Sequence, residues 1–163
     1  HFLNECDTQY DAVALDAFLG DSSPSHLMTE EAFSAIKNVL KPGGTLVINS
    51  FGNFSPRRDF FVSSLDKTLN SVFQSVKIHN DGGGNVYFVA ADRPNLDEFA
   101  RQPDLSRVHP KVKYRVEAAY EGTRRTDPES GISLTDDFNP VEYFDAGNRE
   151  DTRRDLATHM RAQ

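Results

Sequence analysis

Residues 10–27, YDAVALDAFLGDSSPSHL, join an apolar run to a loop that carries carboxylates. The apolar residues follow one another instead of alternating, which predicts a strand over 10–18 that is buried on both faces of a sheet. Asp16 lies where this run ends, and Asp21 follows in the loop. Ligands of open α/β sheets bind beyond the carboxyl ends of the strands. We therefore expect Asp16 to belong to a site; the alternative is that it only caps the following turn.

The composition is that of one globular domain with an acidic surface. The chain has 163 residues, 37% hydrophobic and 26% charged, and a formal net charge of -7. This charge argues against binding to nucleic acid or to an anionic membrane surface. No apolar stretch approaches the roughly 20 residues of a membrane span, and no signal peptide is recognisable. A single cysteine, Cys6, excludes an internal disulfide and favours a reducing compartment, so we expect a cytoplasmic protein.

Helical and strand patterns alternate after the first strand. Residues 25–40 change to a helical period, with Thr29 as a candidate N-cap, and KPGG at 41–44 is expected to stop that helix. A buried strand is predicted at 45–51, a second helix within 57–73, and two strands at 75–80 and 85–92. This order predicts an α/β fold with a partial Rossmann-like mixed sheet. Its parallel strands are followed by an antiparallel hairpin, and helices pack on the sheet.

Three glycines, Gly82–Gly84, stand between the last two predicted strands. A phosphate-binding loop would have to open a helix, whose N-terminal amides hold the phosphate. Because these glycines lie between two strands, we favour a hairpin turn over a phosphate loop.

The segment from YDAVALDAF through KPGGTLVINSFG resembles the central part of the spermidine synthases and spermidine-synthase-like aminopropyltransferases, which have the class I methyltransferase fold. LTDDFNPVE, at 134–142, resembles the C-terminal part of the spermidine-synthase-like branch. The resemblance implies that residues 1–92 form the C-terminal half of a methyltransferase-like Rossmann domain. It leaves 93–163 as a polar C-terminal extension that packs on this half.

The resemblance also assigns site residues. Asp16 matches the aspartate that faces the attacking amine, where a carboxylate must hold the ammonium and accept its proton before attack. Asp21 is offset from the family's second acidic residue, so a plain turn role is equally open, and Asn49 falls near a polar position that contacts the amine. The loop that packs near the nucleoside corresponds here to a segment that includes Ala17, Phe18, Pro24 and Leu27.

Two adjacent acids near the C-terminus, Asp136 and Asp137, are candidates for facing a cationic substrate. The competing structural interpretation is strong, because Asn139 is a suitable N-cap and Pro140 suits the first position of a helix. His26 is better interpreted as a helix-terminal or pocket-wall residue than as a metal ligand. No cysteine or second histidine stands at metal-binding spacing from it, and we expect no metal.

Two parts of the family pattern are not recognisable in these residues: the glycine-rich loop with the ribose-binding acid, and the tyrosine- and proline-containing motif of the diamine pocket. We therefore expect no cofactor to bind this chain alone and no activity from it. The intact enzyme would use decarboxylated S-adenosylmethionine, or S-adenosylmethionine, as co-substrate and a small amine as acceptor. Two alternatives remain: a methyltransferase on the same fold, and a non-catalytic interaction module. The strand at 12–18 would be covered by a second copy of the chain or by the other half of the domain.

Overall fold

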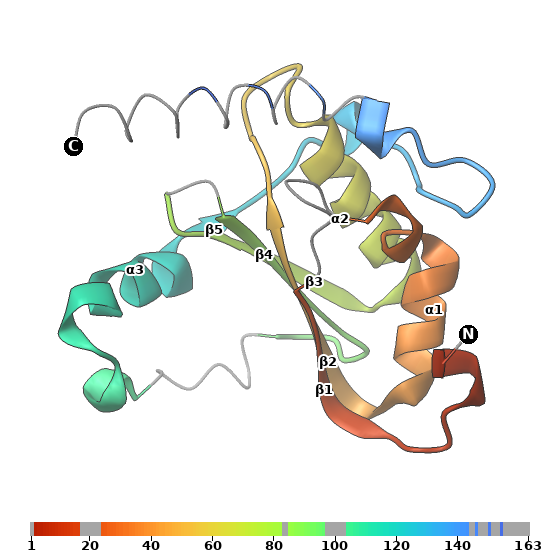
Figure 1. The fold of residues 1–163 in the computed structure, drawn as a ribbon, viewed down its shortest axis with the longest axis horizontal. Helices are drawn as coiled ribbons and strands as arrows, with labels where there is room; N and C mark the ends of the chain where they lie inside the picture. The colour runs from red at the N-terminus through yellow and green to blue at the C-terminus, as the bar shows by residue number, and fades with distance from the viewer. Residues whose placement is uncertain are drawn as a thin grey trace.

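The computed structural model describes residues 2–16, 24–82, 85–96, 104–143, 146, 150 and 154. Within these residues the chain forms one five-stranded sheet whose spatial order is β1-β2-β4-β3-β5 (Figure 1). The strands are β1 (Tyr10–Leu15), β2 (Leu40–Phe51), β3 (Ser75–Asn80), β4 (Asn85–Ala91) and β5 (Thr123–Arg124).

The sheet is mixed, as predicted. β1 and β2 are parallel, whereas β4 is antiparallel to both β2 and β3, and β5 is antiparallel to β3. The turn between β3 and β4 contains Gly82, whose φ of 77° lies in the left-handed region that glycine adopts at little steric cost. The hairpin interpretation of this glycine segment is thereby confirmed.

Two helices, α1 (Glu30–Val39) and α2 (Phe60–Val72), cover one face of the sheet (Figure 1). The Thr29 side chain accepts a hydrogen bond from the Ala32 backbone N–H at 3.2 Å, which confirms the predicted N-cap of α1. α1 ends at Val39, before KPGG, because Leu40 is already extended and pairs with Tyr10 of β1. The predicted start of the second strand at residue 45 was therefore five residues too late.

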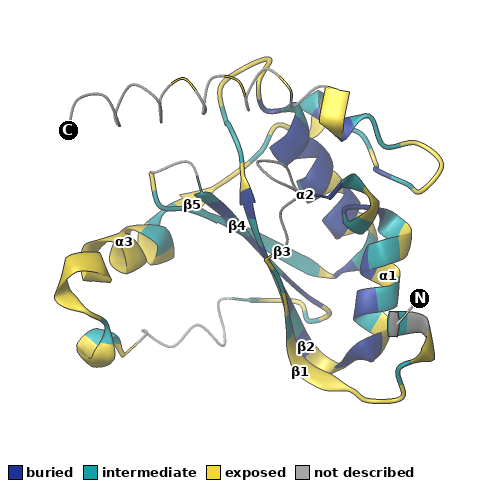
Figure 2. Cartoon of the chain, in the orientation of Figure 1, coloured by how far each residue is buried: buried dark blue, intermediate teal, exposed yellow. Residues whose placement is uncertain are grey.

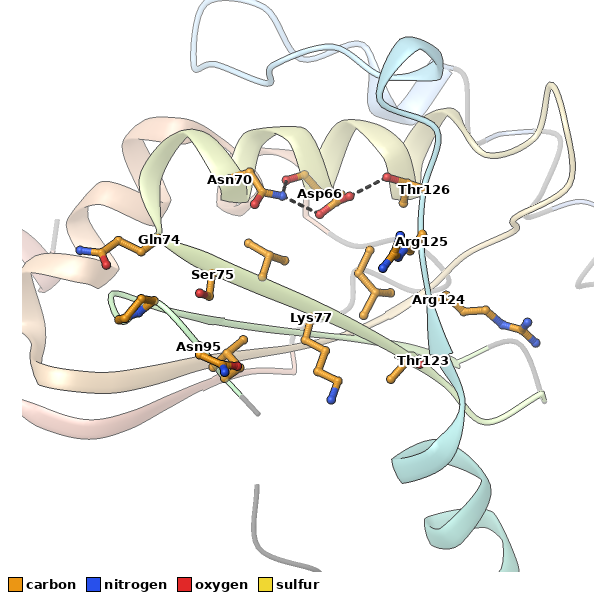
Figure 3. Close-up of a pocket in the computed structure, with 14 residues that line it drawn as sticks. Asp66, Asn70, Gln74, Ser75, Lys77, Asn95, Thr123, Arg124, Arg125 and Thr126 are labelled. Atoms are coloured by element: carbon orange, nitrogen blue, oxygen red, sulfur yellow. Dashed lines mark hydrogen bonds between the residues drawn. The ribbon is translucent and has the colours of Figure 1, made fainter. Parts of the chain in front are cut away.

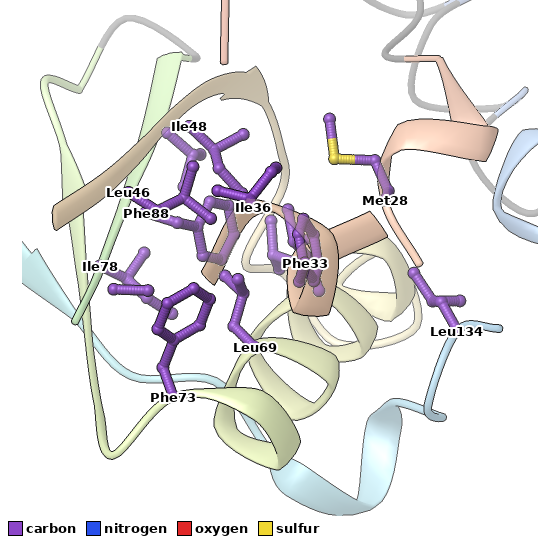
Figure 4. Packing of buried hydrophobic residues seen from close by; sticks show 14 of the residues in the cluster. Met28, Phe33, Ile36, Leu46, Ile48, Leu69, Phe73, Ile78, Phe88 and Leu134 are labelled. Carbon is purple, nitrogen blue, oxygen red and sulfur yellow. The ribbon is translucent and has the colours of Figure 1, made fainter. Parts of the chain in front are cut away.

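The hydrophobic core lies between these helices and the sheet (Figure 4). Phe33 from α1, Leu69 from α2 and Phe88 from β4 are fully buried. Leu46 and Ile48 face the core from β2, while the residues that alternate with them, such as Asn49, lie on the opposite face and are partly exposed. The period of two along β2 thus separates a core face from an open face of the sheet.

The segment after residue 92 joins this core at one place and lies on the open face at another. Gly131 approaches the α2 backbone so closely that a Cβ would lie 2.4 Å from the Ser63 carbonyl carbon. Beside it, the Leu134 N–H donates to Thr68 Oγ1 at 2.9 Å, and Leu134 is fully buried. On the open face lies α3 (Pro110–Glu121), most of whose residues are exposed (Figure 2). The short 3₁₀ helices are Phe2–Glu5, Ser25–Leu27, Leu105–Arg107 and Pro128–Ser130.

The expectation that the first strand is buried on both faces was wrong. β1 ends at Leu15, and its residues are exposed or only partly buried. The reason is its place in the sheet: β2 pairs with one side of β1, and no described strand pairs with the other. α1 and α2 cover only the face that carries Val13 and Leu15, which leaves Ala12 and Ala14 on the open face.

The outer edge of β1 carries no charge or proline between Ala12 and Leu15, and the irregularity in its pairing with β2 lies earlier, between Tyr10 and Ala12. A bare apolar edge is a template for further pairing. We therefore expect this edge to be covered in solution, by a second copy of the chain or by another segment of the protein. Light scattering at micromolar concentration, combined with amide exchange at residues 12–15, tests this. A monomer whose four amides exchange freely would contradict it.

Candidate functional site

Asp16 and Asn49 meet at the carboxyl end of the parallel strand pair. Leu15 of β1 lies opposite Ile48 of β2, so the next residues, Asp16 and Asn49, are also side by side. The Asn49 side-chain amide donates a hydrogen bond to Asp16 Oδ1 at 2.9 Å. The structure thus brings together two of the residues that the sequence singled out, on the open face of the sheet.

The oxygen of the Asn49 side-chain amide, Oδ1, can still accept hydrogen bonds. Within the described part of the chain its Oδ1 is buried and accepts no hydrogen bond. A buried acceptor without a donor is unfavourable by about 1–3 kcal/mol. Asp16 itself is exposed, so its second oxygen can be reached from solvent. The pair therefore combines an exposed carboxylate with a buried amide oxygen that accepts no hydrogen bond within the described residues.

A tyrosine that the sequence analysis did not single out extends this site. Tyr87 of β4 is paired with Asn49 of β2 and with His79 of β3, so the three side chains share the open face. Burial raises the pKa of the Tyr87 hydroxyl, and the charges of Asp81 and, more weakly, Asp16 raise it further; Arg115 and a hydrogen bond with Asn85 oppose the shift. The Tyr87 hydroxyl therefore stays neutral, and the negative charges of Asp81 and Asp16 both act on it.

The loop assigned to nucleoside contact is only partly within the described residues. Ala17, Phe18 and Asp21 lie outside them. Pro24 is buried and Leu27 is partly buried, and the Leu27 N–H donates to the Pro24 carbonyl at 3.0 Å in the turn that precedes α1. The nucleoside-contacting role of these residues stays a prediction.

Of the two C-terminal acids, Asp136 lies at the N-terminus of α1. Asp136 Oδ1 accepts a hydrogen bond from Thr29 Oγ1 at 2.7 Å, and its backbone N–H donates to Glu31 Oε2 at 3.0 Å. A carboxylate in this place is favoured by the helix dipole. These contacts favour the structural interpretation of Asp136, while Asp137 and His26 are exposed.

A hollow of about 890 Å³ lies at the β3 edge of the sheet, between α2, β3 and β5 (Figure 3). Its carboxylate, Asp66, accepts hydrogen bonds from Thr126 Oγ1 at 2.5 Å and from the Asn70 side-chain amide at 2.8 Å. Lys77 and Arg124 also line it, but Figure 3 shows their side chains pointing in different directions. We therefore assign no ligand to this hollow.

No described helix has the length and apolar character that a bilayer crossing requires.

Comparison with known proteins gave curated relatives but no matching family model. The chain is 32% identical over 140 residues to the polyamine aminopropyltransferase of Vibrio vulnificus (strain CMCP6), an alignment that covers 83% of this chain and 46% of that protein. It is 27% identical over 164 aligned positions to a probable polyamine aminopropyl transferase of Bifidobacterium longum (strain NCC 2705), covering 83% of this chain and 34% of that protein.

A crystal structure of a probable spermidine synthase from Corynebacterium glutamicum ATCC 13032 superposes with a TM-score of 0.48 and 21% identity, over 74% of this chain and 49% of that one. The chain spans about half the length, or less, of the curated relatives that it matches. Over most of its own length, then, this chain is a relative of the polyamine aminopropyltransferases, the spermidine-synthase-like family.

Proposed function

We propose that Asp16 and Asn49 form the acceptor-amine site of an aminopropyltransferase. The observation that carries the proposal is their hydrogen bond of 2.9 Å at the ends of two adjacent parallel strands, together with the buried Asn49 Oδ1 that has no donor within the described residues. A primary ammonium carries three N–H donors and one positive charge. It would match the exposed Asp16 carboxylate, with the amide oxygen of the adjacent Asn49 as a further acceptor.

The chemistry follows from what an amine needs before it can attack. Asp16 would hold the ammonium and accept one proton, which frees the nitrogen lone pair. The nitrogen then forms a bond to the propyl carbon that is attached to the sulfonium sulfur of decarboxylated S-adenosylmethionine, and the bond between that carbon and sulfur breaks. The electron pair of that bond returns to sulfur, so the sulfonium leaves as the neutral thioether methylthioadenosine. The proton on Asp16 passes to solvent, to which this residue is exposed.

Two further observations support this proposal. Two curated relatives carry the name of this activity, one of them at 32% identity. The site also lies at the carboxyl ends of parallel strands, where open α/β sheets bind their ligands. The proposal concerns the whole enzyme, whose S-adenosylmethionine-type co-substrate would be held by a Rossmann-like sheet more complete than the one described here. We also propose that the protein is cytoplasmic, because a chain with a single cysteine suits a reducing compartment.

The test uses a chimera in which this chain replaces the matching part of the Vibrio vulnificus relative. Purified chimera is incubated with a diamine and either decarboxylated S-adenosylmethionine or S-adenosylmethionine. We expect methylthioadenosine and an aminopropylated amine from the first co-substrate, and no methylated amine from the second. Methyl transfer alone would replace the proposal with a methyltransferase. A folded chimera that uses neither co-substrate would favour a non-catalytic module.

A further inference from the structure

The helix α3 lies on the side of the sheet away from α1 and α2, and none of its residues is buried (Figure 2). Its C-terminal end is fixed to β3, because His79 Nδ1 lies 2.9 Å from the Ala119 carbonyl oxygen. The Asn80 backbone N–H also donates to the Gly122 carbonyl at 2.9 Å. A helix of 12 residues is only marginally stable by itself in water. Much of the surface of α3 is therefore open to a partner that would stabilise it.

The two sides of α3 carry different residues. Residues three and four positions apart share one side of a helix. Val112, Val116 and Ala119 line a hollow between α3 and the sheet. A second set, which we call the outer stripe, follows the spacing three, four, three on the other side and is exposed: Lys111, Tyr114, Ala118 and Glu121. The Tyr114 side chain is 66% exposed, so the outer stripe presents an aromatic ring to solvent.

The charges of α3 oppose its own dipole. Lys111, Lys113 and Arg115 lie in its first half, whereas Glu117 and Glu121 lie in its second half. A helix is stabilised by acidic residues near its N-terminus and by basic residues near its C-terminus. The first turn of α3 has no acidic residue, and its last turn has no basic residue. The stability of the single helix therefore does not account for this order of charges.

The two charged residues of the outer stripe have no ion-pair partner within the described part of the chain. The ion pairs of α3 there join Lys113 to Glu117 and Arg115 to Asp81, each at 3.8 Å, and include neither Lys111 nor Glu121. In reverse order the outer stripe is its own complement. A basic residue then stands opposite an acidic one, and the aromatic ring stands opposite a small side chain.

We propose that the outer stripe of α3 packs against the outer stripe of a second copy of this chain, with the two helices antiparallel about a two-fold axis. When Tyr114 lies against Ala118 of the second copy, Lys111 lies against Glu121 of that copy. Two-fold symmetry repeats each of these contacts, so both ends of the helix pair join opposite charges. This surface is separate from the Asp16–Asn49 pair and from the outer edge of β1. The inference therefore does not depend on the proposed function.

The test measures self-association of the full chain by sedimentation equilibrium. The concentration runs from about 10 μM to 1 mM, because a contact of three helical turns has the size of a transient interface. We expect a reversible dimer that dissociates as salt is added, since exposed ion pairs are screened. Lys111→Glu and Glu121→Lys should each weaken association by at least about tenfold, because each variant places like charges opposite one another at two positions. Both changes suit the helix dipole better than the parent sequence does, so unfolding of α3 cannot explain the loss.

A mixture of these two variants separates the specific contact from general charge effects. Each variant repels itself, but in a mixed pair positions 111 and 121 again join opposite charges. We expect the mixture to form a heterodimer with an affinity within a few-fold of the parent's. The matched control is Glu129→Lys, which makes the same charge change at an exposed residue of the 3₁₀ helix that packs on α2. It should leave self-association unchanged.

Three results would overturn the inference. The first is a chain that stays monomeric over the whole concentration range. The second is a dimer that is equally stable in the parent and in all three variants, which would favour the outer edge of β1 as the contact between copies. The third is a mixture of Lys111→Glu and Glu121→Lys that associates no better than either variant alone.

Discussion

Asp16→Asn in the active chimera is expected to lower turnover by about 10²- to 10⁴-fold, the range for removal of a positioned general base. Asparagine keeps the size of the side chain and can still accept a hydrogen bond from Asn49. It cannot accept the ammonium proton, however, and it removes the charge that binds the cation. The measurement is the rate of methylthioadenosine release at saturating co-substrate, with circular dichroism to show that the variant is folded.

Asp11→Asn is the matched control for this variant. Asp11 lies at the opposite end of β1, is exposed, and pairs with Lys41 at 2.9 Å. The hydrogen bond from Lys41, and then its charge, hold the pKa of the Asp11 carboxyl below its usual range, so the control removes a real negative charge at neutral pH. It should leave turnover within a few-fold of the parent. Asp16→Asn with turnover as high as this control would remove Asp16 from the mechanism.

The local parts of the fold could be predicted because their causes are local in sequence. The cap at Thr29 and the apolar stripe from Phe33 to Val39 depend on residues within three or four positions of one another. The hairpin at Gly82 depends on glycines between two short strands. The burial of β1 could not be predicted in this way, because an apolar run is the same whether its strand is central or at an edge. That difference is set by sheet order.

The same distinction applies to the site: some of its residues could be predicted from the local sequence, and others could not. The end of an apolar run pointed to Asp16, and the parallel pairing of two successive strands then places Asn49 beside it. Tyr87 could not be found from the sequence, because its position beside Asn49 depends on the register of antiparallel β4 against β2. A polar residue in alternation with buried ones in NVYFVAA was the available indication, and it does not tell which strand lies alongside.

The isolated chain should bind nucleosides of the S-adenosylmethionine type very weakly. In the family that it resembles, nucleoside contacts divide between a glycine-rich loop with a ribose-binding acid and the loop after the catalytic aspartate. Only the second of these is recognisable in the sequence of this chain. The expected result of titration calorimetry with S-adenosylmethionine, its decarboxylated form and methylthioadenosine is no saturation below ~100 μM.

The magnitude follows from what the ribose-binding acid and the loop contribute. Micromolar affinity corresponds to about -8.2 kcal/mol, and each charge-assisted hydrogen bond contributes ~1.5–3 kcal/mol. Loss of two such bonds, together with the loop that keeps water from the adenosine, leaves affinity near the millimolar range. With so little co-substrate bound, the chain alone should transfer neither an aminopropyl nor a methyl group, although amine binding at the proposed site around Asp16 can still be titrated. Low-micromolar binding of any of the three nucleosides would show that this chain carries a complete nucleoside site of its own.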